Sequence, residues 1–141
     1  MISLVCVSQP TCWTRSRKET LDDIQAVSQA RNSALNVTGV LIATTTHFAH
    51  VLEGPKDAVE SVLTSIMSDP RHCRVNVVRR TPIFRRRFPV WRLARMDRGR
   101  FASFALAGTL KRLHTAPDRE TLHHFDQLTD ALARSYHTTL T

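Results

Sequence analysis

The sequence is poor in features that would place it in several common classes of protein. Its three cysteines, Cys6, Cys12 and Cys73, are odd in number and are never spaced as Cys-x-x-Cys. A disulfide framework is therefore not expected, and a reducing cytoplasm is the expected location. No apolar run approaches the roughly 20 residues that a membrane-spanning helix needs. The short apolar run at the N-terminus has no basic leader, so we expect neither a signal peptide nor a membrane segment.

Motifs for catalysis and for metal or phosphate binding are also missing. The chain has four glycines and contains no P-loop and no Gly-x-Gly-x-x-Gly turn. Ser8, Asp23 and His50 could be combined into a triad only without the glycine-bearing nucleophile elbow that such a serine requires. The remaining histidines lack the paired, close spacing of zinc sites. We expect no enzymatic activity and no bound metal.

Negative charge is scarce. Twelve acidic residues face 20 basic ones, which gives a formal net charge of +8 and a pI near 10.7. The basic residues cluster at Arg15–Lys18, Arg79–Arg80, Arg85–Arg87 and Arg92–Arg100. Such a positive field favours acidic partners, although an ordinary solvated basic surface explains the same clusters as well. Nucleic-acid binding is the less favoured interpretation, because no groove-reading helix or set of stacking aromatics accompanies the arginines.

The most informative stretch runs from residue 36 to residue 54. Two apolar, valine-rich runs, Val37–Ala43 and Phe48–Leu52, are separated by the polar segment Thr44–His47, a pattern that predicts a β-hairpin. Side chains alternate along a strand, so His50 shares one face with the two large apolar residues beside it. An imidazole therefore occupies a position where a core would ordinarily have an apolar group.

The 141 residues, 42% of them hydrophobic, suit one domain with a C-terminal extension. Periodicity predicts the order βαββαββ followed by two helices, which is an α+β, ferredoxin-like arrangement. We expect a mixed sheet with two helices on one face. The first two strands are apolar on both faces, so we expect the C-terminal helices to cap the other face or to mediate dimerisation. The predicted strands are Ile2–Ser8, Val37–Ala43, Phe48–Leu52, Cys73–Arg80 and Trp91–Met96, the last at an edge, and the predicted helices are Thr20 to about Leu35, Pro55–Ser68, Phe101–Leu113 and Pro117–Tyr136.

The first predicted helix carries two patterns. Thr20 is its expected cap, and its expected apolar stripe includes Ile24 and Val27. Ser28, Arg31 and Asn32 share the neighbouring face. They could form the solvated side of the helix or line one wall of a ligand pocket, and spacing alone favours the solvated side.

Several fragments together resemble the BLUF family, the flavin-binding domains that sense blue light. They cover roughly residues 2 to 97 in the family's order and spacing, and we take 1–97 as the BLUF-like domain and 98–141 as a helical extension. The resemblance implies a ferredoxin-like fold with FAD held between the two helices of the domain. The fragments are LVCVS at 4–8, SQARNSALNVTGVL at 28–41, FAHVLEGP at 48–55, DPRH at 69–72 and PIFRRRFPVW at 82–91.

The resemblance also implies functions for individual residues. Asn32 matches the asparagine that hydrogen-bonds the isoalloxazine edge, and Arg31 matches a position that contacts the ring. Ser28 matches a residue that lines the same wall of the flavin pocket. Arg71 and His72 match positions near the ribityl-phosphate part. The matching apolar pocket positions are Ile24, Leu41, Phe48, Leu52 and Ile66.

The chain departs from the family at its photoactive positions. The family uses a strand-one tyrosine as electron and proton donor and a strand-three glutamine that rearranges its hydrogen bonds. Here these positions are Cys6 and His50, and the methionine expected in the tail is Leu93. A protonated thiol is a poorer donor than a phenol, and a neutral imidazole has one donor where an amide has two. Trp91 remains a conceivable electron donor if its side chain points inward.

Two main functions follow from these observations. The first is a sensory domain that binds FAD but has lost the usual photocycle and signals to a downstream protein partner. The second is a flavin-free BLUF scaffold that regulates a partner or oligomerises, with a homo-oligomer expected. Nucleic-acid binding through the basic surface is a third function and the least favoured of the three.

Overall fold

The computed structural model describes residues 1–11, 16–96 and 101–140, with the side chains of 101–105 and 137–140 left aside. Cys12, Arg15 and the predicted domain boundary at residues 97 and 98 lie outside the described residues. Among the helices described, none combines the length and the apolar character that crossing a membrane requires.

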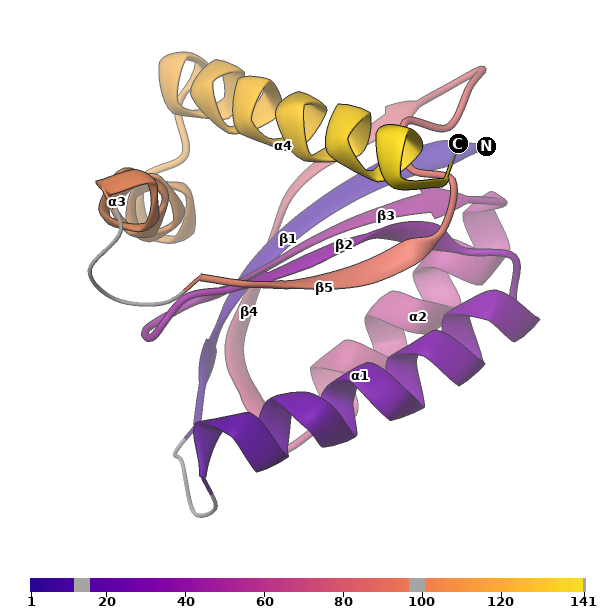
Figure 1. The fold of residues 1–141 in the computed structure, drawn as a ribbon, viewed down its shortest axis with the longest axis horizontal. Coiled ribbons are helices and arrows are strands. Elements are labelled where there is room, and N and C mark those ends of the chain that lie inside the picture. Colours follow the sequence, from indigo (N-terminus) through magenta and orange to yellow (C-terminus); the bar gives the residue numbers. More distant parts are fainter. Residues whose placement is uncertain (12–15, 97–100, 141) are drawn as a thin grey trace.

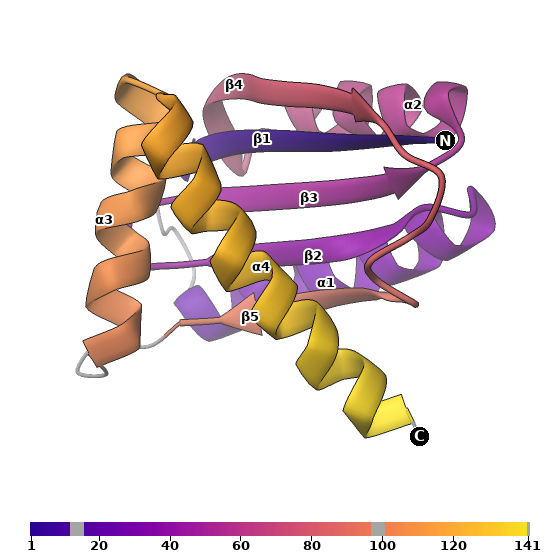
Figure 2. The ribbon, with the colours of Figure 1, turned by 90° about the horizontal axis from the view of Figure 1, so that it is seen from above.

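Five strands form one mixed sheet in the order β4-β1-β3-β2-β5 (Figures 1 and 2). Neighbouring strands are antiparallel except β5, which lies at one edge of the sheet, as predicted, and runs parallel to β2. The predicted ferredoxin-like order is confirmed. The elements are β1 (Ile2–Pro10), α1 (Arg17–Ala34), β2 (Thr38–Ala43), β3 (Phe48–Gly54), α2 (Lys56–Ser68), β4 (His72–Pro82), β5 (Trp91–Arg95), α3 (Phe101–Thr115) and α4 (Arg119–Leu140).

The sheet separates two hydrophobic cores. On one face, residues such as Leu4 and Leu52 pack against α1 and α2. On the other face, residues such as Val5 and Val51 pack against α3 and α4. Figure 1 shows the two helix pairs on opposite sides of the sheet. The C-terminal helices therefore cap the second face, which explains why β1 and β2 are apolar on both sides.

Two glycines of the hairpin are required by close backbone contacts. Gly39 has φ +144°, and a Cβ there would lie 1.8 Å from the carbonyl oxygen of Val51. Gly54 has φ +158°, and its Cβ would lie 2.8 Å from the carbonyl oxygen of Asn36. Residues with a side chain rarely adopt such φ values, and a Cβ would not fit into these spaces. The Thr-Gly and Leu-Glu-Gly fragments are thus explained by backbone packing.

A buried carboxylate joins the hairpin to the arginine-rich segment before β5. Glu53 is completely buried, and its Oε1 accepts hydrogen bonds from the backbone N–H groups of Arg87 (2.8 Å) and Phe88 (2.9 Å). The Arg87 guanidinium lies 3.4 Å from Glu53 Oε2 and donates to Asp130 in α4 at 2.7 Å. One charged network therefore connects β3, the segment before β5 and α4.

The start and the buried face of α1 differ from the prediction. Ser16 rather than Thr20 caps the helix, because its hydroxyl accepts from the backbone N–H of Glu19 at 3.1 Å. Val27, placed on the predicted apolar stripe, is 52% exposed. The buried face instead continues from Ile24 through two polar residues, and the buried residues of α1 are Leu21, Ile24, Ser28 and Asn32.

Candidate functional site

The candidate site lies between the sheet and the helices α1 and α2, with His50 of β3 at its centre. Strand pairing places His50 directly opposite Cys6 of β1 on one side and Leu41 of β2 on the other. All three side chains are buried. Cys6 and His50, two of the three positions that differ from the BLUF pattern, are thus neighbours across one strand pair.

A second histidine approaches His50 from the start of β4. The ring centroids of His50 and His72 are 5.4 Å apart, and those of Phe48 and His72 are 4.8 Å apart. Ser8 of β1 shares a 3.2 Å hydrogen bond with His72 Nδ1. This contact of Ser8 was not predicted from the sequence. The alternation of β1, which puts Ser8 on the face of Cys6, was the available signal.

The polar residues of α1 lie on the side of the sheet that holds His50 and His72. Ser28 and Asn32 are buried, with 7% and 1% of their surfaces exposed, so the solvated-face interpretation that spacing favoured is wrong. Arg31 Nε donates to Asn32 Oδ1 at 3.1 Å. Because that oxygen is engaged, the Nδ2 group of Asn32 is the part of the amide left to bind something else.

Asn32 Nδ2, His50 Nε2 and Trp91 Nε1, on the side of the sheet covered by α1 and α2, are among the buried polar atoms of the described residues that have no hydrogen-bond partner. They come from α1, β3 and β5. A buried polar atom without a partner costs about 1–3 kcal/mol. Most buried polar atoms in folded proteins therefore have a hydrogen-bond partner. The presence of these three atoms in one layer makes this layer the candidate site for a polar ligand.

Burial sets the protonation of the site. It lowers the pKa of His50 well below the ordinary value, and neighbouring His72 and Arg31 lower it further. Burial likewise lowers the pKa of His72 to about 4 and raises the pKa of Cys6 to about 12. At neutral pH the site therefore holds two neutral imidazoles and a protonated thiol, with the cationic Arg31 beside them.

Arg71 is already engaged within the chain. Its guanidinium binds both carboxylate oxygens of Asp69, at 2.6 Å for the shortest contact, and this pairing raises the pKa of Arg71. Asp69 also accepts from the Arg71 backbone N–H at 2.9 Å. These bonds shape the turn that presents His72 to the site.

The apolar residues selected from the sequence belong to one cluster on this face of the sheet. They come from α1, the two strands β2 and β3, and α2, and each is at most 3% exposed. The partly buried Leu93 packs against the same cluster. The members selected from the sequence are Ile24, Leu41, Phe48, Leu52 and Ile66.

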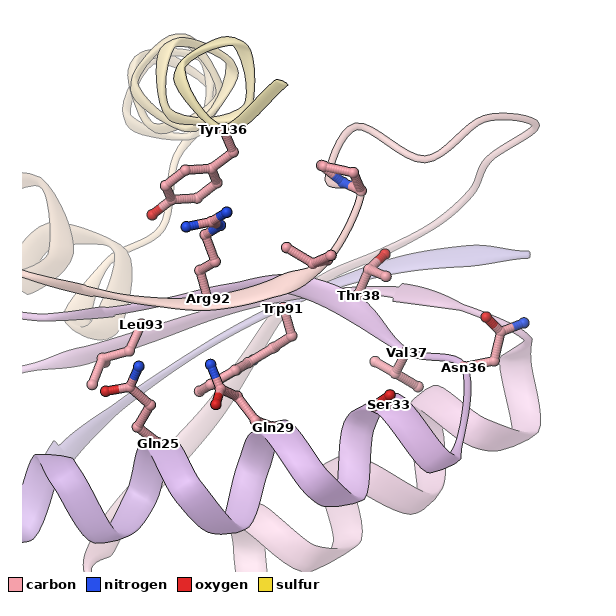
Figure 3. A pocket seen from close by; sticks show the side chains of 12 residues that line it. Gln25, Gln29, Ser33, Asn36, Val37, Thr38, Trp91, Arg92, Leu93 and Tyr136 are labelled. Carbon is pink, nitrogen blue, oxygen red and sulfur yellow. The ribbon is translucent and has the colours of Figure 1, made fainter. Parts of the chain in front are cut away.

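A cleft of about 730 Å³ borders the site at the β5 edge. Figure 3 shows Trp91 pointing from β5 toward α1, where Gln25 and Gln29 stand, while Arg92 and Tyr136 lie on the other side of the strand. Trp91 is 6% exposed. The sequence does not single out these two glutamines, because an i,i+4 pair of amides is common on the exposed surface of a helix.

The comparisons with known proteins agree on one family. The family model described as "Sensors of blue-light using FAD" matches residues 1–94. The photoactivated adenylate cyclase subunit beta of Euglena longa is 36% identical over 105 residues, which are 74% of this chain and 12% of that protein. The matched part of the chain thus spans about an eighth of that relative's length.

Solved structures share the fold over nearly the whole chain. The dark-state structure of the BLUF protein BlrB has a TM-score of 0.76 and 28% identity, covering 95% of this chain and 96% of BlrB. A Klebsiella pneumoniae BlrP1 complex with calcium and cyclic diGMP has a TM-score of 0.65 and 28% identity, covering 94% of this chain and 34% of BlrP1.

Proposed function

This chain belongs to the BLUF family of blue-light sensors that use FAD, and on that premise we propose that it is a flavin-binding sensory domain whose usual photocycle is lost. The observation that carries the proposal is the group of unpartnered buried atoms, Asn32 Nδ2, His50 Nε2 and Trp91 Nε1. Hydrogen-bonding atoms at a flavin ring edge would satisfy them.

The residues present fit the cofactor. Asn32 and His50 would hydrogen-bond the ring edge, Arg31 would add a positive charge, and the apolar cluster on the sheet would cover the ring and exclude water. Arg71 and His72 would lie toward the ribityl-phosphate part. When bound, FAD would supply blue-light absorption and one-electron chemistry.

Cys6 and His50 support the loss of the usual photocycle. The thiol of Cys6 stays protonated, and it stands where the family has a phenol O–H that donates a proton and an electron. The neutral imidazole of His50 has a single N–H and cannot exchange donor and acceptor ends by rotation as an amide does. Trp91, which points inward, is the remaining aromatic donor that we propose at this site.

Flavin binding is tested by absorbance. The purified chain should show a flavin spectrum after incubation with FAD and gel filtration, and Asn32→Ala should weaken FAD affinity about tenfold, the equivalent of one lost hydrogen bond. Gln127→Ala removes an exposed amide from α4 and is the matched control. A folded protein that emerges colourless would refute the proposal and favour the flavin-free scaffold.

The lost photocycle is tested by restoring both residues. Blue light should leave the flavin absorbance of the wild-type protein without a reversible red shift, and the double variant Cys6→Tyr, His50→Gln should acquire one. A reversible red shift in the wild-type protein would show that the present residues suffice. A flavin-loaded double variant without a light response would show that other residues were also lost.

A further inference from the structure

The segment from Ile83 to Val90, here named the β4–β5 loop, exposes an aromatic side chain. Phe84 is 100% exposed, whereas Phe48, Phe88 and Phe125 are completely buried. Figure 1 shows this loop standing away from the sheet beside the N-terminus. Met1, itself 47% exposed, accepts a 3.0 Å backbone hydrogen bond from Ile83. Two exposed apolar side chains therefore lie at the same end of the sheet.

The loop holds this side chain outward because its base is firmly anchored. Glu53 binds the backbone of Arg87 and Phe88, as described above. Arg86 donates to Thr38 Oγ1 at 2.9 Å and to the carbonyl oxygens of Glu53 (2.9 Å) and Asn36 (2.8 Å). A loop fixed in this way loses little conformational freedom when its tip binds a surface.

Positive charge surrounds the exposed aromatic. The three hydrogen-bond partners of Arg86 are neutral oxygens, and within the described residues no carboxylate pairs with Arg86 or with the exposed Arg85. Lys56 is also exposed where β3 ends, with Asp57 as the neighbouring acid. The whole chain adds a net charge of +8. The end of the sheet thus combines apolar surface with unneutralised cations.

We propose that the β4–β5 loop docks on an anionic phospholipid surface, with Phe84 inserted among the lipids, Arg85 at the headgroups and the anchored Arg86 adding positive charge behind them. An apolar anchor and a cationic patch are the two signals that peripheral membrane binding requires together. Single-stranded nucleic acid is the less suitable partner, because it stacks on successive aromatics along a groove. Phe84 is the single exposed aromatic of this anchored loop.

Vesicle sedimentation tests the proposal with the full chain. The protein should bind vesicles of equal parts phosphatidylglycerol and phosphatidylcholine and should not bind pure phosphatidylcholine. Phe84→Ala should lower the partition coefficient about tenfold, and Arg85→Gln about fivefold. Met67→Ala removes an exposed apolar side chain from α2, and Arg119→Gln removes a cation at the start of α4; both controls should bind like the wild type.

Fluorescence supplies an independent readout. Phe84→Trp should add an emission that shifts to the blue with the anionic vesicles and that brominated lipids quench. Equal binding by the Phe84→Ala and Met67→Ala variants would overturn the proposal, because charge alone would then explain the binding. Tighter, Phe84-dependent binding to an oligothymidylate than to the vesicles would assign the loop to nucleic acid and would also overturn it.

Discussion

Removing the carboxylate of Glu53 should be among the most destabilising single changes in the sheet. Glu53→Ala leaves two backbone N–H groups, the half-buried one of Arg87 and the buried one of Phe88, without their acceptor. Each unsatisfied group costs about 1–3 kcal/mol. The Arg87 guanidinium also loses one of its two carboxylate partners, although Asp130 still neutralises it at 2.7 Å. We expect the free energy of unfolding to fall by about 3–5 kcal/mol.

Urea unfolding followed by circular dichroism measures this loss, with an unchanged m-value showing that the native fold is retained. Glu60→Ala is the matched control, because Glu60 forms its ion pair with Arg80 at the exposed surface of the protein. Its unfolding midpoint should stay close to that of the wild type. Similar midpoints for the two variants would refute the argument that the buried carboxylate organises the segment before β5.

Two further predictions concern the backbone and pH. Gly39→Ala should prevent folding, because its Cβ would lie 1.8 Å from a backbone oxygen, whereas Gly108→Ala, with open space around it, should fold normally; soluble expression and circular dichroism separate the two outcomes. The pKa of His72 is lowered from 6.5 to about 4, so the unfolded chain binds more protons and stability should fall as pH drops from about 6.5 to about 4. Urea midpoints across this range should decline less in His72→Gln, and an equal decline in both proteins would contradict the assignment.

The sequence was sufficient for the elements and their order, because alternation and helical periodicity are strong in strands and helices that are buried on a defined side. His50 was recognisable as a misplaced polar residue for the same reason. The pairing of its strand with β1 then places it opposite Cys6.

Other features depend on long-range packing and leave no local signal. Spacing cannot decide which of two adjacent faces of α1 meets the sheet, so the burial of Ser28 and Asn32 was not predictable from periodicity. Glu53 alternates onto the second face of β3, but its partners lie 34 and 35 residues away. The exposure of Phe84 likewise follows from contacts that anchor the loop on either side of it.

The pairing of Cys6 with His50 argues that the two substitutions form a single change. A phenol at position 6 and an imidazole at position 50 would compete for the same space across one strand pair, since both positions are completely or almost completely buried. The small thiol leaves room for the ring of His50 and for the approach of His72, whose centroid is 5.4 Å away. Restoring tyrosine alone would crowd these rings, and restoring glutamine alone would leave no phenol to act with it. Unpartnered polar atoms beside Cys6 and His50 therefore support the proposal that the pocket binds a ligand without the family's usual photocycle.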